Sequence, residues 1–134
     1  MKSLPGSSRR PTYTGRGALI GEAARRCVLT ARAIRLYEQI GLVSFDRDDA
    51  GIRYFDQAAL QRLEYIAEMR RAGLALKDIA LLIETELAQG VAARDQLAMA
   101  VCHEKLEGLD TARARLAEMI DSLQGAATSA SRAA

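Results

Sequence analysis

Arginine is the residue type whose spacing in this chain most clearly suggests chemistry. Arg32 and Arg35 are three residues apart, the spacing that places side chains on one face of a helix. Arg47 and Arg53 flank a turn-forming segment that ends in Gly51. A planar guanidinium can donate two parallel hydrogen bonds to one phosphate. The pattern therefore indicates contact with an anionic backbone, as found in nucleic acids.

Few residues support catalysis or metal binding. The single histidine, His103, follows Cys102, and neighbours on a helix point about 100° apart, so the two converge poorly on one ion. Cys27 and Cys102 are expected to be small buried core residues, and there is no Gly-rich phosphate loop. We therefore expect no enzyme, no metal and no cofactor.

Charge and hydropathy narrow the functional classes further. The net charge is +2, but the first seventeen residues contain Lys2, Arg9, Arg10 and Arg16 and no acidic residue, whereas residues 84–134 are net acidic. No apolar run approaches the roughly 20 residues that span a bilayer, and the N-terminus lacks an apolar signal core. These features favour a cytoplasmic protein that associates with the nucleoid and not with a membrane.

The elements that would position the arginines are two short helices and a hairpin. Ile20, Ala23, Ala24 and Cys27 follow helical spacing. Thr30 is a good N-cap for a second helix that ends near Gly41. In that helix Ile34 and Tyr37 would face inward, and Arg32, Arg35 and Gln39 outward.

Two short apolar runs, residues 42–43 and 52–55, predict the strands of a hairpin wing that carries Arg47 and Arg53. Asp56 then predicts the N-cap of a third helix that ends at Gly73. A fourth helix would follow, up to Gly90.

A narrow apolar stripe follows in a long helix from Val91 to Leu123. One series recurs every seven residues and a second runs three residues behind it, as in the a/d seam of a coiled coil. The seam comprises Met99, Cys102, Leu106, Leu109, Arg113, Leu116, Ile120 and Leu123. Such a stripe needs a partner, either a second chain or the protein's own domain, and its length favours a second chain.

These elements predict a mainly α fold, in which a winged helix-turn-helix domain precedes a long dimerisation helix. We expect a flexible basic arm at residues 1–18, the winged domain at 19–88, the coiled coil at 89–124 and a disordered tail at 125–134. The arm is either a phosphate-tracking segment or a solvated leader without a role.

Several short motifs at matched spacings resemble the MerR family of bacterial transcription regulators. The sequence from Ile34 to Glu38 reads Ile-Arg-Leu-Tyr-Glu, Gly-Leu follows at Gly41, and Gly-Ile-Arg-Tyr-Phe runs from Gly51 to Phe55. The order of the elements from Leu19 to about Leu123 is also similar. The resemblance implies a homodimer, joined by an antiparallel coiled coil, that binds a pseudo-palindromic promoter and distorts its spacer for RNA polymerase.

The resemblance also assigns individual DNA contacts. Thr30 and Arg32 match the start of the recognition helix, and Arg35 and Tyr37 its backbone-anchoring pair. Tyr37 is equally suited to the core, and Glu38 is expected to pair with a nearby arginine. Arg53 matches the wing arginine, and Arg70 or Arg71 the phosphate contacts of a second wing.

The chain also departs from the family pattern. Leu36 stands in place of an aromatic residue, Val28 takes a turn position where Gly is common, and Ile52 and Phe55 replace tyrosines of the wing. The lost hydroxyls leave the base preference open.

Two other functions fit the same elements. An architectural or recombination accessory protein would bend DNA without transcriptional output. An interaction adaptor would use the long helix to pair with a different chain. DNA-dependent transcription and solution mass distinguish these from a homodimeric regulator of double-stranded DNA.

Overall fold

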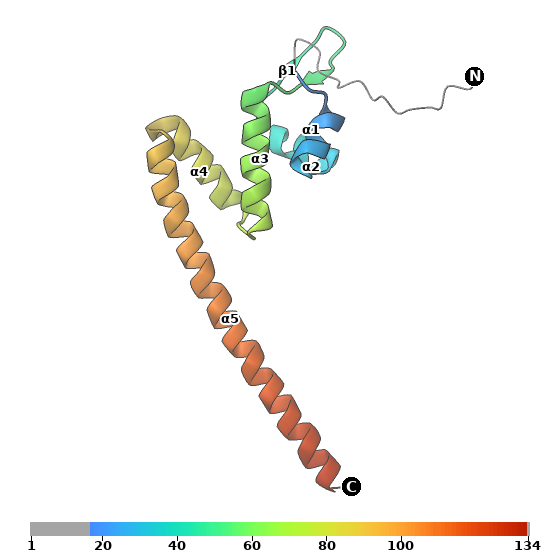
Figure 1. Cartoon of the computed structure of the whole chain (residues 1–134), viewed down its shortest axis with the longest axis vertical. Helices are drawn as coiled ribbons and strands as arrows, with labels where there is room; N and C mark the ends of the chain where they lie inside the picture. The colour runs from blue at the N-terminus through green and yellow to red at the C-terminus, as the bar shows by residue number, and fades with distance from the viewer. Residues whose placement is uncertain (1–16, 134) are drawn as a thin grey trace, which may run out of the picture. The chain divides into compact units, whose positions relative to one another are not determined.

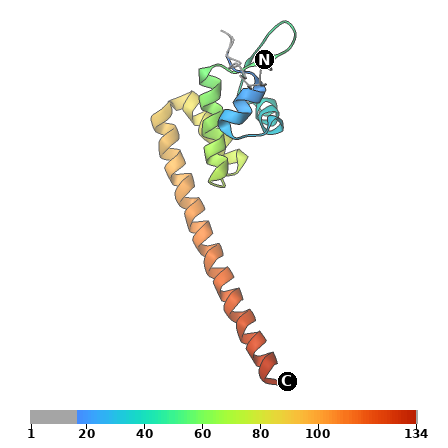
Figure 2. The same cartoon turned by 45° about the vertical axis from the view of Figure 1, so that its right-hand side comes forward.

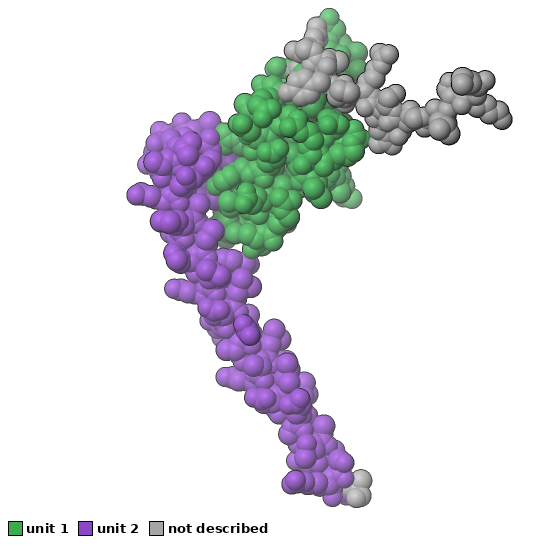
Figure 3. Space-filling model, in the orientation of Figure 1, with its two compact units in different colours: residues 1–80 green, residues 81–134 purple. Residues whose placement is uncertain are grey.

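The computed structural model describes residues 17–133 and confirms a mainly α, winged helix-turn-helix fold that is followed by a long helix (Figure 1). The elements are α1 (Ile20–Cys27), α2 (Ala31–Gln39), β1 (Asp46–Arg47), β2 (Arg53–Tyr54), α3 (Gln57–Arg71), α4 (Leu76–Gln89) and α5 (Val91–Ala133). The chain forms two compact units, residues 1–80 and 81–134 (Figure 3). Their boundary lies within α4, before the domain end expected at residue 88, and the extent of the DNA-binding region stays a prediction.

The first unit packs the helices α1, α2 and α3 and the start of α4 around a shared apolar core. α1 packs against both α2 and α3 (Figures 1 and 2). The fully buried large side chains of this unit are Ile34, Phe55, Leu60, Leu63, Ile66 and Ile79. Cys27 is buried as expected, and burial raises the pKa of its thiol. The helices are thus fixed by a shared core and not by their own short lengths.

The two predicted N-caps are confirmed, which explains where α2 and α3 begin. The Thr30 hydroxyl accepts a hydrogen bond from the Ala33 amide at 3.0 Å, and the Asp56 carboxylate accepts one from the Ala59 amide at 2.8 Å. Each satisfies a backbone donor that the first helical turn leaves free. The predicted ends at Gly41, Gly73 and Gly90 are also confirmed.

The first strand of the wing was predicted at the wrong residues. Leu42 and Val43 form no strand but are buried in the core, 6% and 5% exposed. The antiparallel ladder instead pairs Asp46 with Tyr54 and Arg47 with Arg53. The turn geometry, not an apolar run, sets this two-residue pairing, because the wing has little core to cover.

The N-terminal arm was predicted to extend too far. Residues 1–16 lie outside the described residues, but Gly17 and Ala18 are buried. Ala18 exchanges two backbone hydrogen bonds with Phe55, at 2.9 and 2.7 Å. These residues therefore belong to the folded unit and add a bridge at the base of the wing.

The C-terminal tail is also corrected. The sequence predicted that α5 ends at Gly125, but the helix continues to Ala133 and is 43 residues long. A single internal glycine costs a helix only about 1 kcal/mol, and half of the residues from 126 to 133 are alanine. No helix within residues 17–133 is long and apolar enough to cross a membrane.

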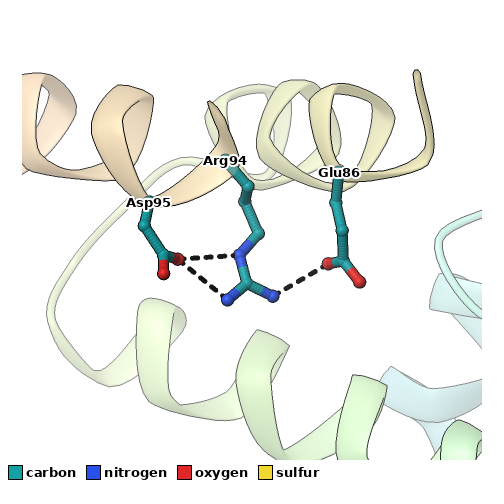
Figure 4. A network of polar contacts seen from close by, with 3 residues as sticks. All are labelled: Glu86, Arg94 and Asp95. Atoms are coloured by element: carbon teal, nitrogen blue, oxygen red, sulfur yellow. Dashed lines mark hydrogen bonds and ion pairs between the residues drawn. The ribbon is translucent and has the colours of Figure 1, made fainter. Parts of the chain in front are cut away.

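An ion-pair network ties the end of α4 to the start of α5 (Figure 4). The Arg94 guanidinium donates to Glu86 at 2.8 Å and to Asp95 at 2.8 and 3.0 Å. Because Gly90 lies between these residues, the network fixes the direction in which α5 leaves the turn.

The contact at Gly17 generates a stability prediction. Gly17 has φ +116°, and an added Cβ would collide with the Phe55 carbonyl. We expect Gly17→Ala to lower the free energy of unfolding by about 2 kcal/mol or more. The matched control Gly51→Ala shares a positive φ of 80° but meets open space, so it should lose only about 1 kcal/mol. Urea unfolding measures both, and equal losses would contradict the predicted backbone clash.

Candidate nucleic-acid interface

The orientation of α2 is set by the side chains that it buries. Ile34 and Tyr37 are 0% and 5% exposed, so they fix one face of the helix against the core. Arg32, Arg35 and Gln39 are exposed on the remaining surface, as predicted from the sequence. The core therefore presents a polar helix face outward, which is the arrangement that a DNA groove requires.

This face of α2 is hollowed and carries two arginines without a protein partner within residues 17–133. The lining residues are Thr30, Arg32, Ala33, Arg35, Leu36 and Gln39. Within residues 17–133, neither Arg32 nor Arg35 forms a side-chain hydrogen bond or ion pair. Both guanidinium groups retain their donors for a phosphate or a base edge. Leu36 adds an apolar surface where a thymine methyl group could pack.

The turn between α1 and α2 contains a residue with left-handed backbone angles that is not glycine. Val28 has φ 53° and ψ 48°, and its side chain is 78% exposed. A β-branched residue is strained in this conformation. The turn also forms a second shallow hollow, lined by Ala24, Arg25, Val28, Leu29 and Thr30.

A single carboxylate joins the wing to α2. Glu38 Oε1 accepts a hydrogen bond from Arg47 at 2.6 Å, and Glu38 Oε2 accepts one from Arg53 Nε at 2.7 Å. The two arginines are direct partners across the β-ladder. The expectation that Glu38 pairs with a nearby arginine is confirmed, and it pairs with two.

The wing arginines keep Glu38 ionised. Partial burial acts to raise the pKa of Glu38, but the hydrogen bonds and positive charges of Arg47 and Arg53 outweigh it and lower the pKa. The ionised carboxylate is therefore the form that the fold stabilises.

An aromatic pair lies beside Arg53. The Arg53 guanidinium lies 5.7 Å from the centre of the Phe45 ring, and Phe45 and Phe55 have centroids 4.3 Å apart. Phe55 is fully buried, so these rings connect the wing to the core. Glu38 accepts from the Nε of Arg53, so the terminal nitrogens of this guanidinium remain available to a further acceptor.

The wing tip is held by Asp48. Its Oδ1 accepts hydrogen bonds from the amides of Ala50 and Ile52, both at 2.9 Å. Its Oδ2 accepts one from the Tyr54 hydroxyl at 3.3 Å. Gly51 has φ 80° in this turn, so the predicted hairpin role of that glycine is confirmed.

The remaining predicted residues are not brought to this cluster. Tyr37 is in the core, where it holds α2 in place. Arg70 and Arg71 lie at the C-terminal end of α3, the end away from the hairpin (Figures 1 and 2). Arg70 donates to the Leu74 carbonyl at 2.9 Å, and Arg71 is exposed. These two arginines would form a separate contact region.

Two residues at this surface were missed from the sequence. Arg25 lines the hollow at the turn and pairs with Glu22 at 2.9 Å. Its three-residue spacing from Glu22 was a usable signal. Asp48 was overlooked, although an aspartate three residues before Gly is typical of side-chain-capped turns.

A helix-turn-helix, a small wing and a further helical pair define the winged helix-turn-helix class of DNA-binding proteins. Two family models match within this chain. The MerR HTH family of regulatory proteins matches residues 19–86, and the MerR DNA-binding family matches residues 60–126. The chain belongs to the MerR family of DNA-binding transcription regulators.

Relatives and solved structures agree with this assignment. An uncharacterised HTH-type transcriptional regulator of Pseudomonas aeruginosa is 32% identical over 112 residues, 79% of this chain and 85% of its own length. A MerR family regulator of Listeria monocytogenes has a TM-score of 0.62 at 26% identity, covering 80% of this chain and 83% of that chain. HiNmlR, a family member without the sensor domain, was solved on promoter DNA; its TM-score is 0.56 at 24% identity over 77% of each chain, a likeness of fold alone.

The Glu38 contacts predict a pH-dependent stability. Because the folded-state pKa of Glu38 is lowered, its contribution is complete above its unfolded pKa of about 4.3 and is lost as the pH falls through the lower folded value. We expect Glu38→Gln to lower the free energy of unfolding by about 1 kcal/mol at pH 7, with the deficit shrinking towards pH 3. Urea unfolding at both pH values measures this deficit. Glu68→Gln, on the exposed side of α3, is the control, and equal deficits for the two variants would refute the role of Glu38.

Proposed function

We propose that the chain acts as a homodimeric regulator that inserts α2 of each copy into the major groove of a pseudo-palindromic promoter. The observation that carries this proposal is the exposed face of α2, on which Arg32 and Arg35 have no partner within residues 17–133. A basic, hollowed helix face opposite a firmly buried one suits groove binding. The regulator would work in the cytoplasm, with no catalytic step and no cofactor.

The arginines divide into two kinds of DNA contact. Arg32, near the N-terminus of α2, is placed for a base edge, as is Gln39 at its other end. Arg35 and the wing arginines Arg47 and Arg53 are placed for phosphates. Thr30 caps α2 and leaves its hydroxyl hydrogen available to a phosphate at the helix start.

A second set of backbone contacts would come from Arg70 and Arg71. α3 contains 15 residues and is therefore about 22 Å long, so these arginines lie well away from the wing. Contacts at separated points along the duplex can hold bent DNA and offset its deformation. A distorted promoter spacer would then let RNA polymerase engage both promoter elements.

The second copy would be supplied by α5. Its large apolar seam residues are exposed in the single chain; Leu106, Leu116 and Leu123 are 56%, 60% and 66% exposed. Burial of such a stripe against a second helix is strongly favoured by the hydrophobic effect. Dimerisation would place two recognition helices on the two halves of one operator.

DNA binding tests the proposed contacts. Arg35→Ala combined with Arg53→Ala should raise the Kd for the promoter of the protein's own or neighbouring genes by about tenfold or more. Because each copy of the dimer loses two phosphate contacts, the slope of log K against log salt should also become shallower by about 4. Mobility shifts over a salt series measure both values. Arg115→Ala on α5 is the control, and an unchanged Kd and slope in the double variant would remove these residues from the interface.

The oligomeric state tests the role of α5. Leu106→Glu places a charge within the seam and should convert the dimer to a monomer at micromolar concentration. Thr111→Glu adds the same charge on the outer face of the same helix and should leave the dimer intact. Sedimentation equilibrium gives the mass of each variant. A monomeric wild-type chain would refute the proposed homodimer.

A further inference from the structure

The seam of α5 contains one charged residue among apolar ones. Arg113 continues the series of Met99, Leu106 and Ile120, where each other member is apolar. It forms no ion pair within residues 17–133. A guanidinium buried in a helix–helix seam is tolerated only if an acid accompanies it. The seam therefore needs a partner that supplies a carboxylate at this level.

We propose that a second copy supplies this carboxylate from Asp110, in an antiparallel pairing whose two-fold axis passes level with Thr111. Asp110 follows the seam residue Leu109 and so lies at the edge of the same stripe. In this register Arg113 of each copy lies opposite Leu109 of the other and reaches its Asp110. The inference rests on the proposed homodimer and adds the pair that fixes its orientation and register.

The spacing of the seam residues on either side of Thr111 favours this register. Centred at Thr111, every seam residue faces another seam residue. The opposed pairs are Met99 with Leu123, Cys102 with Ile120, Leu106 with Leu116, and Leu109 with Arg113. All of them lie on α5, and each large apolar member is at least half exposed in the single chain.

A slide by one heptad in either direction weakens the interface. Towards the N-terminus, Ile120 would face Asp95 and Leu123 would face Ala92. Towards the C-terminus, Met99 would face Ala130, and Arg113 would face Leu116 with no acid beside it. Only the register centred at Thr111 combines the full apolar seam with a partner for the arginine.

The charges also select the direction of pairing. In a parallel, in-register dimer, Arg113 of one copy would face Arg113 of the other in a single layer, and Asp110 would lie across from Lys105. Two guanidinium groups would then share an apolar layer without an acid. The antiparallel pairing instead gathers two arginines and two aspartates around the axis. Along the axis the two carboxylates lie between the two arginines, and each arginine is one residue in level from the aspartate of the other copy, closer than the two aspartates are to each other, so attraction exceeds repulsion.

Opposite charge changes on separate chains test the pairing. Arg113→Glu leaves only acids at the axis, and Asp110→Lys leaves only cations, so each variant should dimerise at least tenfold more weakly than the wild type. An equimolar mixture should recover a dimer, because the introduced glutamate meets the introduced lysine of the other chain. Within each chain the two positions still carry like charges, so a contact inside one helix cannot explain the recovery. Analytical ultracentrifugation with one chain fluorescently labelled follows the mixture.

Arg115 provides the matched control for the charge experiment. It lies two residues from Arg113 but on the outer face of α5, where it is exposed. Arg115→Glu should leave the dimer Kd unchanged. Circular dichroism of each variant verifies that α5 stays helical. If the mixture forms no heterodimer while all variants stay helical, the Arg113–Asp110 contact is overturned.

Cross-linking tests the direction and the register independently. In the proposed pairing, Ala112 of one copy lies across the seam edge from Ala112 of the other, offset by only about 3 Å along the axis. Lys105 is about 18 Å along the axis from its own copy. In a Cys102→Ala background, a short bis-maleimide should join Ala112→Cys chains and leave Lys105→Cys chains unlinked. A parallel dimer would link neither variant, and a dimer shifted by two heptads towards the N-terminus would link Lys105→Cys.

These experiments test the homodimer and the register of its coiled coil separately. A dimer in which Ala112→Cys is not cross-linked overturns the register but leaves the proposed homodimeric regulator standing. A wild-type chain that sediments as a monomer overturns the homodimer itself. A dimer that is linked at Ala112→Cys and regains its affinity only in the mixture supports both.

Discussion

The position of the wing depends on the two hydrogen bonds that Glu38 accepts from Arg47 and Arg53. A wing of two paired residues cannot fix its own position, because a hairpin of this size is marginal in water. Glu38 lies on α2, whose orientation is set by the buried Ile34. The same core that aims α2 therefore aims the wing, through one carboxylate. In the proposed complex, phosphates would share the two guanidinium groups that Glu38 neutralises in the free protein.

Burial and charge are divided cleanly along α2. The residues that fix the helix are apolar and inaccessible, so they can contribute nothing to sequence reading. Arg32, Arg35 and Gln39 contribute nothing to the core, so they are free to change without loss of the fold. Leu36 extends this exposed face with an apolar group. In the proposed interface, recognition and stability would depend on different residues of one nine-residue helix, which is the condition for a family to vary its operators on a constant scaffold.

Most of the fold could be predicted because its signals are local. Thr30 and Asp56 mark helix starts by side-chain chemistry, and the glycines at 41, 73 and 90 mark helix ends. The errors arose where tertiary packing decides. Leu42 and Val43 form a short apolar run that is typical of a strand, but both side chains are buried in the core. Gly125 has the chemistry of a helix end, yet the alanine-rich residues beyond it continue α5. The double role of Glu38 could not be read from sequence, because its partners are 9 and 15 residues away.

The long helix places a further constraint on recognition. A single DNA-binding domain of this size makes few contacts with DNA. Specificity for one site in a genome needs more base pairs than one α2 can touch. Two recognition helices on one operator multiply the contacts with DNA only if the distance between the helices is fixed. With an apolar seam alone, one α5 could slide along the other by a heptad. Each slide would move the two recognition helices apart or together by about 10 Å. One charged residue in the seam, such as Arg113, removes that freedom at some cost in stability. In the proposed dimer, the residue that looks least suited to the seam would then be the one that sets the spacing of the DNA contacts.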